Sequence, residues 1–296
     1  MHTALVVLPN FALIVVGVVL ARYFDYGREF WSGLEALVYF VLFPALLFRS
    51  LALAHIDLAT AGILVGSAWI FTTAAFLLSL LAGPVLRLDP RLAAAGSQCG
   101  YRFNTYIGLA VAGSLFGDPG VALAALLLGA MIPLANLMAV GVLARHGTRG
   151  FTSELVRHPL VLASLAGFAW NAAGLPLPGF ADQTLGLLGQ TSLPAGLLCV
   201  GAAMRLEPGG GEKAAHAWWL TVKLAIAPAV AWALAHAWNI GGMEAKVLIL
   251  CAALPTASNA YILAVRMIGD GRVVATEVTV GTLLSMATLP LWMAAP

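Results

Sequence analysis

Two asparagines in similar surroundings are the residues of this chain best placed to bind a ligand. Asn104 opens the sequence NTYIGLAV, and Asn259 opens the similar sequence NAYILAV about 155 residues later. Both lie in apolar stretches long enough to cross a bilayer, where a polar side chain is costly and usually functional. Two such residues at matching places in two halves of a chain predict a binding site at a repeat interface, as in many transporters.

Two cations lie in equally apolar surroundings. Arg102 stands about eleven residues into its stretch, near the bilayer midplane, and Ala257 occupies the matching position of the second half. The guanidinium fits a substrate carboxylate, or else the freed carbonyls of a broken helix. Lys223 lies roughly six or seven residues inside its span. It could extend to the interface, or approach the crossing of the broken spans and act as a second anion ligand or a titrating group.

The sequence around the asparagines predicts that both spans are interrupted. Gly100 lowers helix propensity before Asn104, and Pro255 removes a backbone donor before Asn259. Pro133 is expected to add a further break. Freed backbone groups at this depth need partners, which Asn, Thr and Ser supply. The half-helix N-termini would direct partial positive charge at the crossing, which favours an anion and especially a carboxylate.

Further polar residues near the breaks are candidate substrate ligands, although such residues also hold transmembrane helices together. They are Thr105, Asn136, Thr256, Ser258, Thr282 and Ser285. The acidic residues, including Glu35, Glu244 and Glu277, fall in predicted loops or near span ends. No midplane carboxylate for sodium or protons is therefore predicted. Sodium coupling through carbonyls and hydroxyls, proton coupling through Lys223, and uniport driven by the membrane potential all stay open.

The composition places the chain in a membrane. Hydrophobic residues make up 61% and charged residues 9% of the sequence, whereas soluble domains carry roughly 25% charged residues. The formal charge of +2 is too small to indicate a nucleic-acid partner. No Lys or Arg precedes the first apolar run, so we expect a retained span rather than a signal peptide. The cysteines, Cys99, Cys199 and Cys251, show no ligand spacing, so no disulfide framework, metal site or cofactor is predicted.

Apolar runs and charges predict the topology. A span needs about 20 apolar residues, and ten segments qualify: roughly 4–22, 33–53, 59–83, 92–116, 119–144, 159–175, 183–204, 215–238, 243–268 and 273–295. One side of the membrane would hold Arg22, Arg28, Arg87, Arg91, Arg145, Arg149, Arg157, Arg205, Lys213, Arg266 and Arg272. The other side would hold only Arg49 and Lys246. The first side is therefore predicted to be cytoplasmic, with both termini outside a bacterial inner membrane.

Five spans per half is an odd number, so two homologous halves must insert with opposite orientations. The first repeat would cover residues 1–150 and the second residues 151–296. The sequence PALL at 44–47 resembles PAGLL at 194–198, which supports the correspondence. The predicted fold is an all-α polytopic membrane protein of ten transmembrane helices in two inverted five-helix repeats, with the fourth and ninth helices broken and crossed.

Four short segments resemble the auxin efflux carrier family, whose bacterial members include malonate and malate permeases. They are RFNTYIG at 102–108, IPLAN at 132–136, LPTA at 254–257 and TLLSMATLP at 282–290. The resemblance implies an elevator-type transporter, often a homodimer, with spans 1, 2, 6 and 7 as scaffold and spans 3–5 and 8–10 as the moving core. Plant members carry a proline where Ala110 stands here. The first crossing is therefore expected to be less sharply broken, and auxin is not implied.

Together these features predict secondary transport of a small organic anion, with a dicarboxylate such as malonate or malate as the first choice. Arg102 and Lys223 would neutralise carboxylates, and Asn104 and Asn259 would orient them. One alternative is a sodium-coupled symporter of bile-acid type or a sodium/proton antiporter. Another is a membrane receptor or sensor that binds its ligand without moving it. The sequence contains no HExxH, GxSxG or paired intramembrane acids, so an enzyme is not expected.

Overall fold

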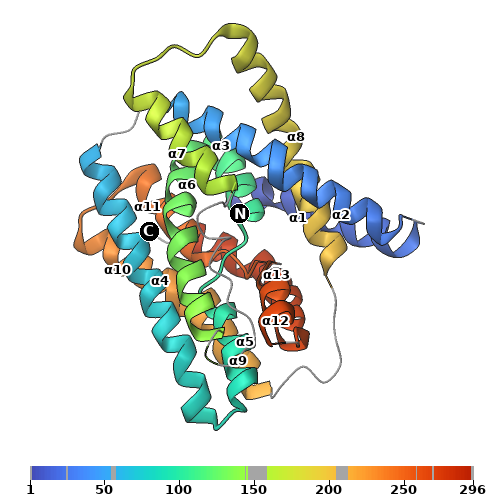
Figure 1. Cartoon of the computed structure of the whole chain (residues 1–296). Coiled ribbons are helices and arrows are strands. Elements are labelled where there is room, and N and C mark those ends of the chain that lie inside the picture. The colour runs from blue at the N-terminus through green and yellow to red at the C-terminus, as the bar shows by residue number, and fades with distance from the viewer. Residues whose placement is uncertain are drawn as a thin grey trace. The chain divides into compact units, whose positions relative to one another are not determined.

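The computed structural model describes residues 2–24, 26–54, 58–143, 145, 159–204, 213–257, 259–268 and 270–294. Within these ranges every regular element is a helix (Figure 1). The first half contains α1 (His2–Tyr23), α2 (Arg28–Leu37), η1 (Val38–Leu42), α3 (Phe43–Ala52), α4 (Leu58–Leu86), α5 (Pro90–Ser97), η2 (Gln98–Gly100) and α6 (Thr105–Leu143). The second half contains α7 (Pro159–Ala172), α8 (Gly179–Ala203), α9 (Lys213–Thr221), η3 (Val222–Ile226), α10 (Ala227–Ala237), α11 (Gly242–Ala253), α12 (Asn259–Ile268) and α13 (Arg272–Ala294).

Several helices are suited to a bilayer. Among the described residues, six helical stretches are long and apolar enough to cross one: Glu29–Ala52, Thr60–Leu86, Pro90–Leu143, Gly179–Ala203, Lys213–Ala237 and Arg272–Ala294. Two shorter apolar helices cover Leu8–Tyr23 and Pro159–Ala172. The chain is therefore a polytopic helical membrane protein. The count of ten spans and the inverted repeat stay predictions.

The residue contacts divide the chain into two compact units, and each unit draws on both halves of the sequence. Unit 1 contains residues 1–61, 106–130 and 156–203. Unit 2 contains residues 62–105, 131–155 and 204–296.

Close helix packing holds unit 1 together. Helix α8 packs on α1 and α3, and α7 packs on α3 (Figure 1). Gly17 of α1 and Gly201 of α8 lie so close to the facing backbone that a Cβ at either position would collide with it. The side chain of Asn171 donates hydrogen bonds to the carbonyls of Ala52 (3.0 Å) and Ala54 (2.7 Å), which ties α7 to the end of α3.

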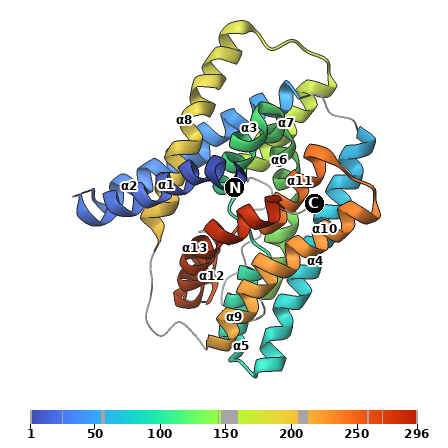
Figure 2. The same ribbon diagram turned by 180° about the vertical axis from the view of Figure 1, so that it is seen from behind.

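Helix α9 lies beside α4 in unit 2 (Figure 2). Two tryptophans of α9 attach it to α4 through hydrogen bonds. The indole of Trp218 donates to the carbonyl of Leu78 (2.9 Å), and that of Trp219 donates to the carbonyl of Ser79 (3.2 Å). Trp219 is fully buried, and its ring lies against Gly96 of α5. This packing brings α4, α5 and α9 together.

Helix α6 departs from the expectation for Pro133. Its backbone is helical at Pro133, so the break expected there is absent, and non-helical dihedrals occur instead at Gly117 (φ 64°). A proline inside a membrane helix removes one hydrogen bond, and neighbouring helices can offset that loss. A positive φ favours glycine because glycine has no Cβ. The break in this segment therefore lies sixteen residues before Pro133.

Candidate functional site

Two non-helical segments of unit 2 interrupt apolar helices. The first, residues 101–104, lies between η2 and α6, and the second, residues 254–257, lies between α11 and α12. Pro255 has no amide hydrogen and disfavours a helical conformation in the residue before it, so α11 ends at Ala253. Asn104 directly precedes α6, a position where asparagine is favoured because its side chain can accept hydrogen bonds from the first helical amides.

Hydrogen bonds join the two interruptions. The backbone amide of Asn104 donates to the carbonyl of Pro255 at 2.8 Å. The hydroxyl of Thr256 donates to the carbonyl of Cys99 at 2.7 Å. Both bonds connect residues about 150 positions apart in the sequence. Each half-helix therefore finds partners for freed backbone groups in the other interruption.

The side chain of Lys223, a residue of η3, reaches the C-terminal end of α11. This side chain is buried, and Nζ donates to the carbonyl of Ala252 at 3.1 Å. This carbonyl is among the last of α11, which have no helical donors, and the negative end of the helix dipole favours a cation there. The lysine is therefore directed into the protein rather than toward the membrane interface.

Lys223 lies in a π-helical turn, and a proline just after this turn leaves one of its carbonyls without a backbone donor. Pro228 has no N–H to donate to the carbonyl of Leu224, four residues earlier. That carbonyl instead accepts a hydrogen bond from the indole of Trp292 at 2.9 Å. The preceding turn, η3, has π-helical hydrogen bonding, a geometry often found at functional sites.

Arg102 is the second buried cation of unit 2. Its side chain is 6% exposed, and its backbone amide donates to the carbonyl of Gln98 at 3.0 Å. Among the described residues three charged side chains are buried, namely Arg102, Lys223 and Glu277, and all three belong to unit 2. Two cations thus lie at or beside the interruptions.

Two further polar groups near Arg102 were not among the sequence candidates. The side-chain amide of Gln98 and the hydroxyl of Tyr101 are buried and have no hydrogen-bond partner within the part of the chain that the structure describes. The ring of Tyr101 packs edge-on against Phe76, with centroids 5.2 Å apart. Because a buried polar group without a partner costs about 1–3 kcal/mol, both groups are candidate ligand contacts. The signal that could have found them is their polarity within an apolar run beside Arg102.

The remaining sequence candidates are distributed unevenly. Asn104 is buried, whereas the side chain of Asn259 is exposed. Thr105 and Asn136 are half-buried. The hydroxyls of Thr282 and Ser285 donate to carbonyls of their own helix, at 2.6 and 2.7 Å. Ser258 lies outside the described residues.

Gly100 acts in this structure through its small size. A Cβ at Gly100 would collide with the hydroxyl of Ser79 in α4 and would approach the side chain of Val222. The absence of a side chain thus allows η2 to lie against α4 and η3, directly before the first interruption.

An acidic residue that the sequence places near a span end is in fact buried. Glu277 lies in the second turn of α13, with 1% of its side chain exposed. Its Oε1 shares a hydrogen bond of 2.6 Å with Nδ1 of His216 in α9. Neither residue was a sequence candidate, because each stands near the end of a predicted span.

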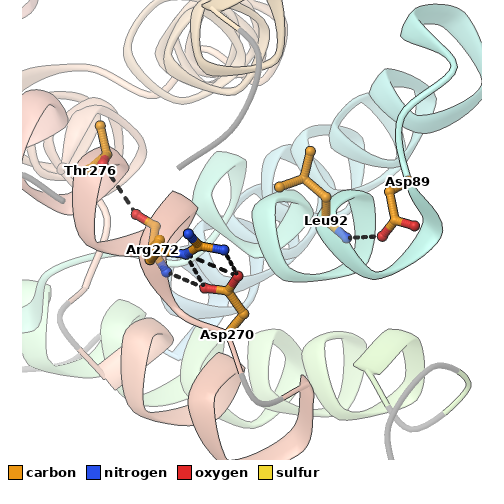
Figure 3. A network of polar contacts seen from close by, with 5 residues as sticks. All are labelled: Asp89, Leu92, Asp270, Arg272 and Thr276. Carbon is orange, nitrogen blue, oxygen red and sulfur yellow. Dashed lines mark hydrogen bonds and ion pairs between the residues drawn. The ribbon is translucent and has the colours of Figure 1, made fainter. Parts of the chain in front are cut away.

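Two aspartates fix the starts of helices in unit 2 (Figure 3). Asp89 accepts hydrogen bonds from the amides of Arg91 (2.9 Å) and Leu92 (3.1 Å) and so caps α5. Asp270 accepts from the amide of Arg272 (2.9 Å) and from its guanidinium (2.8 Å) just before α13. These hydrogen bonds with Arg272 lower the pKa of Asp270.

Within the described ranges, no group of three or more His, Cys, Asp or Glu residues could hold a metal ion. A hollow of about 580 Å³ lies elsewhere in unit 2, near the end of α4. Among the described residues that line it, Arg87 is the only charged one.

Comparison with known proteins gives the class. The sequence model of a family described as "Membrane transport protein" matches residues 143–293. The chain belongs to this family, which is the auxin efflux carrier family that the motifs resemble, and it is a transporter rather than an enzyme.

Two relatives match along almost their whole lengths. A Rhizobium meliloti protein named "Putative malonate transporter" is 25% identical over 309 residues, which cover 96% of this chain and 92% of the relative. An "Uncharacterized transporter" of Methanothermobacter thermautotrophicus is 26% identical over 304 residues, covering 97% of this chain and 96% of the relative.

Proposed function

We propose that this protein is a secondary transporter of small organic anions, with a dicarboxylate such as malonate or malate as the first substrate to test. The observation that carries the proposal is the burial of Arg102 and Lys223 beside two interrupted helices. Burying a cation in a membrane protein costs several kcal/mol unless a partner offsets it. A bound anion would be a further partner for both cations, in addition to the groups that they already contact. The name of the Rhizobium meliloti relative supports malonate as a first choice.

Each group has a separate role in this proposal. Arg102 would hold one carboxylate through two parallel hydrogen bonds. The ammonium of Lys223 has three donors, of which the Ala252 carbonyl takes one, so it could also reach a second carboxylate. Asn104 and Thr256 would orient the substrate, and the N-termini of α6 and α12 would add partial positive charge.

The proposed movement is an elevator-like exchange of access. In this proposal the repeats are residues 1–150 and 151–296, and the scaffold and the moving core are those that the family resemblance implies. The two compact units support it, because unit 1 contains α1, α3, α7 and α8, whereas both interruptions lie in unit 2. Residues 106–130 join unit 1, although the expected grouping assigns them to the core. A homodimer and insertion in the inner membrane belong to the same proposal.

The test is uptake of labelled malonate and malate into proteoliposomes. Arg102→Ala should raise the apparent KM roughly 30-fold or more, because losing one partner of a buried, hydrogen-bonded charge pair costs about 2–5 kcal/mol. Arg91→Ala is the matched control, since Arg91 is exposed on α5 eleven residues earlier, and its kinetics should equal those of the wild type.

Three other outcomes would contradict the proposal or part of it. Unchanged kinetics in Arg102→Ala would remove this residue from the site. Saturable binding of a dicarboxylate without any flux would favour a receptor. Uptake of bile acids that requires sodium, without dicarboxylate uptake, would favour the sodium-coupled alternative.

A further inference from the structure

A buried acid–base pair in unit 2 lies outside the two interruptions. Glu277 of α13 and His216 of α9 share a hydrogen bond of 2.6 Å, and their side chains are 1% and 17% exposed. The second carboxylate oxygen of Glu277, Oε2, is buried without a hydrogen-bond partner among the residues that the structure describes. Burying an ionised carboxylate is costly, and a protonated histidine beside it offsets part of that cost. The free energy of this buried pair therefore depends on whether the pair binds a proton.

The pair is connected to the first interruption. Both α9 and α13 pack against η2, the short helix that ends just before residue 101. The thiol of Cys99 in η2 lies within electrostatic reach of Glu277. The carbonyl of Cys99 accepts the hydrogen bond from Thr256 in the second interruption. A change of charge at the pair would therefore change the electrostatic potential at η2, which is hydrogen-bonded to the second interruption.

We take Arg102 and Lys223 as protonated cations and Glu277 as an ionised carboxylate, all three of them buried in unit 2. In these states the two cations contribute two positive charges and Glu277 contributes one negative charge. With neutral His216 the net charge of these groups is +1, and with protonated His216 it is +2. A bound dicarboxylate of charge −2 then leaves a net charge of zero with the proton and −1 without it. Because net charge inside a membrane is costly, the proton and the substrate should favour each other's binding.

We propose that His216 and Glu277 form the proton-binding site that couples dicarboxylate transport to the proton gradient, with one proton for each dianion. This inference rests on the proposed function. The proton adds to the neutral imidazole of His216 and forms an imidazolium that donates a hydrogen bond to the ionised carboxylate of Glu277. Release of the same proton on the other side restores the neutral imidazole, and no other bond changes. By linkage, the proton must strengthen substrate binding by the same factor as the substrate strengthens proton binding.

Other titratable groups lie on the elements packed against α9 and α13. They are Arg91 on α5, Cys99 on η2, Lys213 on α9, Lys223 on η3, Glu244, Lys246 and Cys251 on α11, Tyr261 and Arg266 on α12, and Arg272 on α13 itself. Of these, Cys99 lies within electrostatic reach of Glu277, and Lys223 donates to the end of α11. His216 is the titratable group found at hydrogen-bonding distance from Glu277 in the described part of the chain.

The experiment measures malonate accumulation in proteoliposomes with the membrane potential clamped to zero. With the outside one pH unit more acidic, the wild type should accumulate malonate about tenfold, because one pH unit corresponds to a factor of ten for one coupled proton. His216→Gln and Glu277→Gln should not accumulate malonate, although exchange of internal for external malonate should persist and show that they fold. His236→Gln and Glu244→Gln are matched controls in unit 2, and His236 is exposed on α10. Both should accumulate malonate as the wild type does.

Several results would overturn the inference. Accumulation that ignores the pH gradient, that follows a sodium gradient instead, or that survives in both variants would overturn it and leave anion transport in place. If neither variant exchanges malonate, proton uptake by the purified wild type on malonate addition decides the question. About one proton per bound malonate supports the inference, and none overturns it. A wild type that exchanges no anion would overturn the proposed function as well.

Discussion

At the scale of single residues, Asp270 offers a test of how an exposed charge contributes to stability. Hydrogen bonds from Arg272 (Figure 3) lower the pKa of Asp270 below its ordinary value. Both side chains are about half exposed. A carboxyl whose pKa is lower in the folded state stabilises the fold above its unfolded pKa of about 3.9. That contribution is lost as the pH falls through the folded pKa.

Asp270→Asn should therefore lower the thermal stability of the detergent-solubilised protein slightly at pH 7, by less than about 1 kcal/mol for an exposed pair. The difference from the wild type should shrink below about pH 4 and should also shrink in high salt. An equally large difference at pH 3 and pH 7 would show that the ionised carboxylate is not the cause.

The sequence predicts part of the candidate site because a polar residue is conspicuous in an apolar run. Arg102, Lys223 and Thr256 stand out in this way, and the structure places all three at or beside the interruptions. Glu277 does not stand out, because it lies close to a predicted span end. Its burial depends on pairing with His216, 61 residues away, and a single sequence shows no sign of such a pairing.

At the scale of secondary structure, one glycine determines how closely α5 approaches α9. A Cβ at Gly96 would collide with the buried ring of Trp219, whose indole is held by a hydrogen bond to Ser79. Gly96→Ala should gain up to about 1 kcal/mol of helix propensity but lose about 1–3 kcal/mol through overpacking. We expect a net loss of thermal stability, measured in detergent solution.

Gly66→Ala is the matched control for this prediction. Gly66 lies within α4 of the same unit, and a Cβ there would meet no other atom within 4 Å. This substitution should leave stability unchanged or raise it through helix propensity. Equal effects of the two substitutions would mean that the contact between α5 and α9 does not limit packing.

Prolines show why helix breaks are only partly predictable. Pro255 coincides with the end of a helix, Pro133 lies within one, and Pro228 follows a π-helical turn. All three remove the same backbone donor. The result differs because it depends on what replaces that donor's hydrogen bond, such as the indole of Trp292 for the carbonyl of Leu224. These replacements come from distant residues, so apolar runs predict the helices better than their interruptions.

At the scale of the whole molecule, the charge bias predicts opposite exposure for two surface positions of unit 2. Arg87 follows α4 and Asn239 follows α10, and both side chains are exposed. By the positive-inside rule, Arg87 should face the cytoplasm and Asn239 the outside. The three native cysteines are buried, so they should give little background in a labelling experiment.

In intact cells a membrane-impermeant maleimide should therefore label Asn239→Cys but not Arg87→Cys. After permeabilisation both variants should react. Labelling of Arg87→Cys alone in intact cells would reverse the predicted orientation, and with it the outside location of both termini.

The bond between the amide of Asn104 and the carbonyl of Pro255 consists only of main-chain atoms. No substitution removes the carbonyl, and only a change of Asn104 to proline would remove the amide hydrogen. A mutational scan will therefore underestimate how strongly the two interruptions hold each other. The amide proton of Asn104 itself remains a direct probe, because it exchanges with solvent deuterium only when this bond opens. Its exchange rate, with and without ligand, would report how often the two halves of the site separate.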